Sequence, residues 1–134
     1  MGNEVKTYDP DQVSVIVGGT IIKSWNKIMV AKDEDDWTFN AGTTGEVTRT
    51  RNLNRLGTIT LTLPQTSADN GILSAFAVSG GLLSCVVKDG SGRSLHVMPE
   101  GTVVKPADSE YGKESGERAW SLKGAVVEMT VGGN

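Results

Sequence analysis

The chain is poor in the residues that build large cores, disulfides and metal centres. Its 134 residues include one cysteine, one histidine, three tryptophans, two tyrosines and two phenylalanines. The single Cys85 excludes an internal disulfide, and its place in an apolar run predicts a buried thiol. The single His96 is too few for the two or three imidazoles of a common zinc site. We therefore expect a modest core, no metal and no cofactor.

Excess charge and long apolar runs are also lacking. The formal net charge is −3, from 13 basic and 16 acidic side chains, which gives no general attraction to nucleic acid or to anionic membranes. No stretch reaches the roughly eighteen consecutive apolar residues of a membrane-spanning helix, and the first residues do not resemble a signal peptide. We expect one domain over residues 1–134, no membrane insertion, and a protein made and kept in the cytosol.

Sequence signatures of catalysis are missing as well. The chain has no Gly-x-Ser-x-Gly elbow, phosphate-binding loop or zinc-ligand spacing. His96 alternates with Leu95 and Val97, which predicts the polar face of a strand rather than a catalytic triad. The four acids of 33–36 lack the spaced ligands and glycine of a calcium loop, so we expect a solvated turn. The sequence predicts no catalytic residue and no enzyme.

The most regular pattern lies in residues 58–63, where threonine alternates with Ile59, Leu61 and Leu63. Because strand side chains point to opposite faces in turn, this pattern predicts a half-buried strand with one apolar face and one hydroxyl face. Pro64 has no N–H for a ladder and should end the strand.

One short amphipathic helix is expected over about 67–79. Ser67 is placed to accept a hydrogen bond from a backbone N–H of the first turn. The apolar residues at helical spacing are Ile72, Leu73, Phe76 and Ala77. Gly80-Gly81 should end the helix, since glycine tolerates positive φ.

Several further strands are predicted by apolar runs around glycine-rich turns. These runs are 12–17, 21–22, 27–32, 83–88 and 93–97. We expect residues 98–118 to form a long surface loop, and a change of apolar parity at Lys123-Gly124 predicts a β-bulge or bend. The fold class is therefore mainly β: an antiparallel β-sandwich or barrel with one short α-helix.

Two segments have no core-facing pattern of their own. Residues 1–11 predict an extended arm, and residues of about 36–56 predict an extended loop or hairpin that carries Trp37 and Phe39. Such segments suit a protein interface. Together with Trp25 and Trp120, Trp37 is interpreted as core or interface filler, with a carbohydrate-binding groove as the alternative.

A basic cluster, Arg49, Arg51 and Arg55, has three interpretations. The arginines can be solvated hairpin charge, or they can pair with carboxylates across a subunit interface, for which 33–36 offers spare acids. DNA binding is the third and least favoured.

These features occur together in a known order. The segments are Tyr8-Asp9-Pro10, 13–19, 45–52, 57–63 and 65–70. This combination resembles a family of tail tube proteins from contractile-tailed bacteriophages, over roughly residues 5–130.

The resemblance implies a tail-tube-like fold and a structural role in the virion tail, assembled in the host cytoplasm. Subunits would form six-membered rings that stack into a hollow inner tube, through which phage DNA is delivered without specific binding. Implied partners are further copies of the chain, the tail sheath protein, a tape measure protein in the lumen, and baseplate and tail terminator proteins. Alternatives are the tube of a phage-derived injection device or bacteriocin, and a monomeric β-sandwich that binds glycans.

The residues expected to serve this role fall into two groups. The predicted subunit and ring contacts are Tyr8, Asp9, Pro10, Trp37, Phe39, Arg49, Arg51 and Arg55. The predicted lumen-facing hydroxyls are those of Thr58, Thr60 and Thr62.

Overall fold

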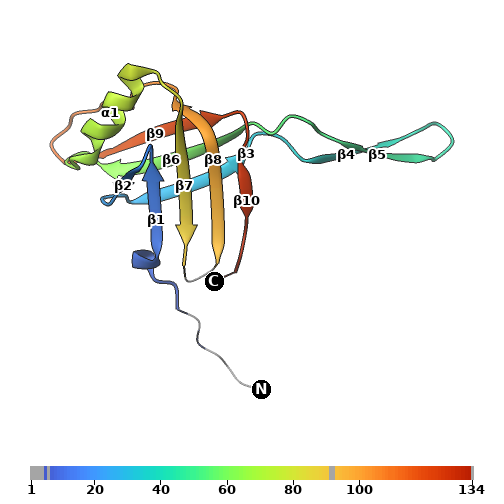
Figure 1. The fold of residues 1–134 in the computed structure, drawn as a ribbon, viewed down its shortest axis with the longest axis horizontal. Coiled ribbons are helices and arrows are strands. Elements are labelled where there is room, and N and C mark those ends of the chain that lie inside the picture. Colours follow the sequence, from blue (N-terminus) through green and yellow to red (C-terminus); the bar gives the residue numbers. More distant parts are fainter. Residues whose placement is uncertain (1–4, 6, 91–92, 134) are drawn as a thin grey trace.

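The structure, a computed structural model, describes residue 5 and residues 7–90 and 93–133. Within these residues the chain forms ten strands, one 3-10 turn and one α-helix (Figure 1). In order they are η1 (Pro10–Gln12), β1 (Val13–Val17), β2 (Thr20–Ile22), β3 (Lys27–Lys32), β4 (Trp37–Ala41), β5 (Val47–Arg51), β6 (Gly57–Pro64), α1 (Asp69–Ser79), β7 (Leu83–Asp89), β8 (Ser94–Val103), β9 (Glu117–Gly124) and β10 (Glu128–Thr130). The expected mainly β, antiparallel class with one short helix is confirmed.

The strands form one folded sheet and one separate hairpin. The sheet has the order β2-β1-β7-β8-β9-β6-β3, with β10 also paired to β8, and β4 pairs only with β5. Strand β8 connects two layers, since its first half pairs with β7 and β10, and Gly101–Val103 pairs with β9. Figure 1 shows β1, β7 and β8 crossing in front of β3, β6 and β9.

Strand β6 shows the predicted alternation. Ile59, Leu61 and Leu63 are fully buried, whereas the threonines between them are partly exposed. Strands β3 and β9 flank β6 along its whole length. The strand therefore presents its apolar face to the core and its hydroxyl face outward, as expected.

The helix begins two residues later than predicted. The Ser67 hydroxyl accepts a hydrogen bond of 3.2 Å from the backbone N–H of Asp69, and Leu73 is fully buried in the core. The Asp69 carboxylate accepts from the backbone N–H groups of Lys23 and Ser24, which ties the helix to the segment after β2. Gly80 ends the helix with φ of 66°, a conformation that glycine adopts without steric cost.

The β1–β2 hairpin is confirmed, and Gly18 and Gly19 adopt φ of 57° and 84° at its turn. The hairpin predicted between 83–88 and 93–97 is also present as β7 and β8, and residues 91–92 of its turn lie outside the described residues.

The prediction of a surface loop over 98–118 is wrong at its start. Strand β8 continues through Pro99 to Val103, and the irregular segment is 104–116. The β7–β8 register shifts between Leu83 and Cys85, opposite this proline. Pro99 is tolerated because it lies where the ladder to β7 is interrupted and its missing N–H is not needed.

The predicted bend near Lys123-Gly124 is confirmed. Strand β9 ends at Gly124, the chain bends at Ala125, and β10 then crosses over to pair with β8. Val127 on this crossing is 1% exposed, so the shift in apolar parity marks a strand that changes layer.

Candidate assembly surfaces

The β4–β5 hairpin projects from the body of the molecule with no other element against it (Figure 1). All ten strand residues are exposed. The register opposes Trp37 to Arg51 and Phe39 to Arg49, which places these four predicted contact residues on one face of the ribbon. The opposite face carries Thr38, Asn40, Thr48 and Thr50. The hairpin thus has an aromatic and cationic face and a polar face.

An aromatic–cation contact organises the first of these faces. The guanidinium of Arg49 lies 3.6 Å from the ring centroid of Trp37, at the distance of a cation–π interaction. Trp37 is 44% exposed and Phe39 is 69% exposed. Two large aromatic surfaces therefore remain uncovered on the ribbon.

Hydrogen bonds fix both ends of the hairpin. At the tip, the N–H of Gly42 donates to the carbonyl of Glu46 at 2.7 Å, and Gly45 has φ of 87°. At the base, the N–H of Asn52 donates to the carbonyl of Asp36, and its side chain donates to Glu34. The direction of the ribbon is consequently set by its own chain.

The expectation that the acids of 33–36 are spare is wrong for three of the four. Asp33 accepts from the hydroxyl of Thr58 at 2.9 Å, and Glu34 accepts from the side-chain amides of Asn52 and Asn54. Asp36 forms an ion pair of 2.9 Å with Lys32. A turn whose strands diverge needs these local acceptors, which composition alone does not reveal.

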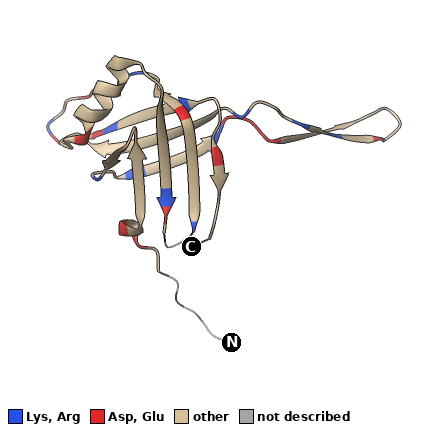
Figure 2. Cartoon of the chain, in the orientation of Figure 1, with Lys and Arg blue, Asp and Glu red and all other residues tan. Residues whose placement is uncertain are grey.

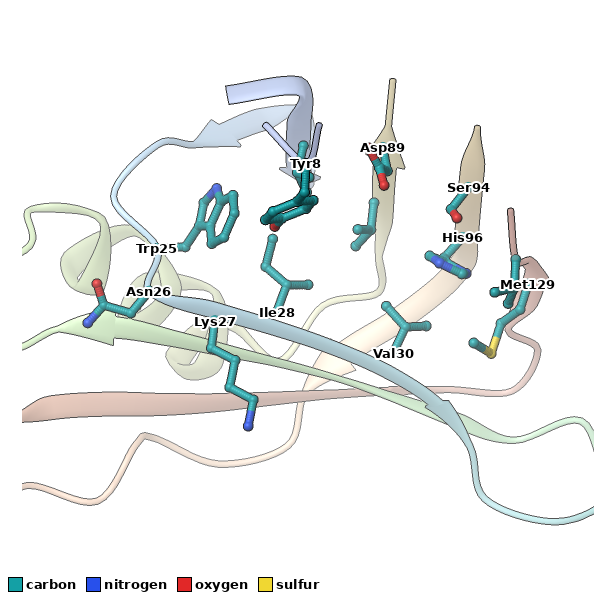
Figure 3. A pocket seen from close by; sticks show the side chains of 13 residues that line it. Tyr8, Trp25, Asn26, Lys27, Ile28, Val30, Asp89, Ser94, His96 and Met129 are labelled. Carbon is teal, nitrogen blue, oxygen red and sulfur yellow. The ribbon is translucent and has the colours of Figure 1, made fainter. Parts of the chain in front are cut away.

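The predicted arm is described only in part, since residues 1–4 and 6 lie outside the described residues. Asp9 accepts a hydrogen bond from the N–H of Asp11 and caps the 3-10 turn, with Pro10 at its first position. Tyr8 is 56% exposed and lines a groove of about 440 Å³ with Trp25 and Ile28 (Figure 3). The arm thus lies far from the hairpin, and the eight predicted contact residues form two separate groups.

His96 also lines this groove, and the prediction that it lies on the polar face is wrong. It pairs with Val87, which is buried, whereas the neighbouring Leu95 is 42% exposed. Alternation separates two faces but does not tell which of them is inside. Burial lowers the pKa of His96 from 6.5, and its Nδ1 has no hydrogen-bond partner among the described residues.

Thr58, Thr60 and Thr62 face away from the core, on the outer side of β6. The register adds neighbours that the sequence did not indicate: Lys27 lies beside Thr62 on β3, and Ser121 and Lys123 lie beside Thr60 and Thr58 on β9. We call this surface the threonine face. These neighbours could be found only from strand pairing, because they lie far apart in the sequence.

The three tryptophans do not share one groove. Trp120 is 4% exposed and belongs to the core, Trp25 lines the groove beside Tyr8, and Trp37 lies on the hairpin. A glycan site made of all three is therefore not present.

Within residues 5, 7–90 and 93–133, no group of three or more acidic, cysteine or histidine side chains is arranged to hold a metal ion. In the same ranges, the helical content does not include a segment with the length and hydropathy needed to cross a membrane.

Comparison with known proteins gives relatives in sequence and in fold. No protein-family model matches the sequence. The chain is 25% identical over 150 aligned positions to structural protein ORF10 of Pseudomonas phage KPP10, which covers 100% of this chain and 87% of that protein.

Similar solved structures extend over nearly the whole chain. A chain of the anti-feeding prophage cap, which terminates the tube of that particle, matches with a TM-score of 0.67 and 10% identity over 97% of this chain and 96% of its own. A chain of the sheath-tube terminator of the PVC extracellular contractile injection system has a TM-score of 0.63 at 12% identity, covering 95% and 99%. A chain of the PVC sheath-tube complex has a TM-score of 0.62 at 10% identity, covering 93% and 92%. The chain therefore has the fold of tail tube and terminator subunits of contractile particles.

Proposed function

We propose that this protein is a structural subunit of a phage tail or contractile injection particle, and that it stacks with copies of itself into a tube. The observation that carries the proposal is the β4–β5 hairpin. A lone two-stranded ribbon is marginal in water, and this one exposes Trp37, Phe39 and Val47 along one face. These side chains gain burial only against another subunit.

The comparisons support the same role. The sequence relative is named as a phage structural protein, and the fold is shared with chains of contractile particles over 93–97% of this chain. In this proposal residues 1–134 form one tail tube domain, in which the arm at 1–11 and the hairpin within 36–56 make the contacts between subunits and rings. The role is structural rather than catalytic.

Six-membered rings with the threonine face toward the lumen complete the proposal. Thr58, Thr60 and Thr62 would expose their hydroxyls to the bore. The lysines of this face, Lys27 and Lys123, are balanced by Glu100 and Glu117 on the neighbouring strands. DNA carries a negative charge about every 1.7 Å of its axis, so a bore with balanced charge does not hold it.

Further partners follow from this position in the particle. The outer side of the ring would meet a sheath protein, the lumen would hold a tape measure protein before DNA passes, and the two ends of the tube would meet baseplate and terminator proteins. A tube that carries no genome, as in an injection device, would use the same contacts.

A terminating cap is the second candidate function, because a tube-terminating cap has the highest TM-score among the structures described above, at 0.67. A cap stacks on one side, whereas a tube subunit stacks on both. The purified protein separates the two: a tube subunit gives hollow filaments of many rings, and a cap gives single rings.

Negative-stain electron microscopy with light scattering at low and high concentration tests the proposal. We expect rings or tubes for the wild-type protein. A variant with residues 38–50 replaced by two glycines should keep the circular dichroism of the body and remain unstacked. A wild-type protein that stays monomeric at every concentration would contradict the proposal.

A further inference from the structure

The two ends of the long axis carry complementary charged hollows. Resting on the proposed function, we infer that the hollow at the base of the hairpin receives the acidic loop, residues 104–116, of a second copy of this chain. The contact would join Arg51 and Arg55 of one copy to Glu110 and Glu114 of the next.

The hollow at the hairpin base has a volume of about 290 Å³ and is the receptor in this pairing. Its charged lining residues are Lys32, Asp36, Arg51, Arg55 and Glu128. Lys32 and Asp36 are joined to each other in an ion pair. Arg51 and Arg55 are exposed, and neither guanidinium forms an ion pair or hydrogen bond with any of the described residues. Two planar guanidinium groups, each able to bind a carboxylate through two hydrogen bonds, therefore remain open beside Trp37.

The acids nearest to these arginines in the sequence do not fill the hollow. Asp33, Glu34 and Asp36 are held by Thr58, by Asn52 and Asn54, and by Lys32. The open arginines must find their carboxylates outside the 33–36 turn.

The opposite end of the molecule presents acids in a second hollow of about 360 Å³. Its charged lining residues are Lys105, Asp108, Glu110 and Glu117. Lys105 pairs with Asp108 at 3.7 Å, and Glu117 accepts from the amide of Asn26. Glu110 and, outside the hollow, Glu114 are exposed and make no such contact within the described residues.

The acidic loop is held in place by the body. The ring of Tyr111 lies 5.3 Å from the guanidinium of Arg118, which is 8% exposed. Gly116 and Gln65 exchange two hydrogen bonds of 2.9 Å, from each backbone N–H to the oxygen of the other residue. Glu110 and Glu114 are therefore presented from a loop that is anchored at its middle and at its end.

One copy cannot bring these two surfaces together. The acidic loop lies beside α1 at one end of the long axis, and the hairpin base lies at the other (Figures 1 and 2). Two copies arranged head to tail can do so, and such a contact uses different surfaces on each partner. It leaves one hollow and one loop free at the ends, so the same contact repeats along an axis.

Charge reversal at both surfaces tests this pairing. The variants are R51E/R55E, E110R/E114R and the combination of all four substitutions. Lys88→Glu on β7, outside both hollows, is the matched control for a reversed surface cation. Pelleted tube is measured beside electron micrographs, and circular dichroism verifies that each variant is folded.

We expect each double variant to lose about tenfold or more of its pelleted tube, because like charges then face each other in every repeat of the contact. The fourfold variant should recover tube formation, and the Lys88→Glu control should match wild type. Folded double variants that assemble like wild type, or a folded fourfold variant that does not recover, would overturn the pairing while the tube proposal stands. A wild-type protein without any assembly would overturn both.

Discussion

The indole Nε1 of Trp120 donates a hydrogen bond of 2.9 Å to Oδ1 of Asn70. Trp120 lies in β9 and Asn70 in the first turn of α1, so this bond joins the helix to the core. The amide nitrogen of Asn70 also donates to the carbonyls of Pro64 and Gln65, at 2.9 and 3.3 Å. One side chain thus holds the helix, the end of β6 and the buried tryptophan together.

We expect Asn70→Ala to lower the free energy of unfolding by about 1–3 kcal/mol, because the substitution leaves the indole N–H without its partner. Urea denaturation measures the loss. Val78→Ala on the same helix is the control, since Val78 is 82% exposed and its change should stay within about 0.5 kcal/mol. Equal stability of the two variants would show that the Asn70 bonds do not hold the helix.

Three glycines form a row across the folded sheet, with Gly124 paired to both Gly57 and Gly101. A Cβ on Gly124 would lie 2.6 Å from Cγ of Met98 and 2.8 Å from the backbone oxygen of Glu100. We expect Gly124→Ala to destabilise the protein by about 1–3 kcal/mol, since the backbone oxygen cannot move aside. Thermal and urea unfolding measure the change.

Gly81→Ala is the control for this substitution, because a Cβ there meets nothing within 4 Å and Gly81 does not have positive φ. Its stability should be unchanged or raised by up to about 1 kcal/mol. If Gly124→Ala were as stable as Gly81→Ala, close approach at the sheet corner would not explain the glycine.

The aromatic face of the hairpin should matter for assembly and not for folding. We expect Trp37→Ser/Phe39→Ser to keep the free energy of unfolding within about 0.5 kcal/mol of wild type, because both rings contact mainly solvent in the single chain. Tube formation, followed by sedimentation, should be lost. Thr38→Ser/Thr50→Ser on the opposite ribbon face is the control and should assemble, so loss in both variants would argue against a specific face.

Stability should fall on mild acidification because of His96. Burial holds its folded-state pKa below 6.5, so the unfolded chain binds the proton more tightly. The free energy of unfolding should therefore decrease as the pH falls through about 6.5, and this decrease should level off below the folded-state pKa. Urea titrations between about pH 8 and pH 5 measure the slope.

The variant His96→Gln should lose this part of the pH dependence, because it removes the titrating imidazole while keeping a polar side chain. Identical slopes in the two proteins between these pH values would assign the effect to other groups.

Local patterns predicted most of the fold. The Thr58–Leu63 alternation and the Gly18-Gly19 turn each specify an element within a few residues, because pleat and turn geometry are local. The length of β8 was missed because its tolerance of Pro99 depends on a partner strand that changes at that point. The inward position of His96 was missed for the same reason, since the choice of inner face is made by the other layer.

The candidate site was predictable in its residues and not in its arrangement. Exposed aromatics and arginines in 36–56 indicated an interface, and strand register then placed Trp37, Phe39, Arg49 and Arg51 on one face. The use of Asp33 and Asp36 within the chain depends on contacts with Thr58 and Lys32 that no spacing rule specifies.

Strand β8 hydrogen-bonds to β7, β10 and β9, so neither layer can separate while β8 stays in place. Its amide hydrogens should exchange with solvent deuterium only when the whole body unfolds. The amides of β4 and β5 are protected by a single partner strand each, and they should exchange by local opening at rates that assembly slows. Hydrogen exchange would thus divide the chain into a cooperative body and a ribbon whose order is completed by its neighbour.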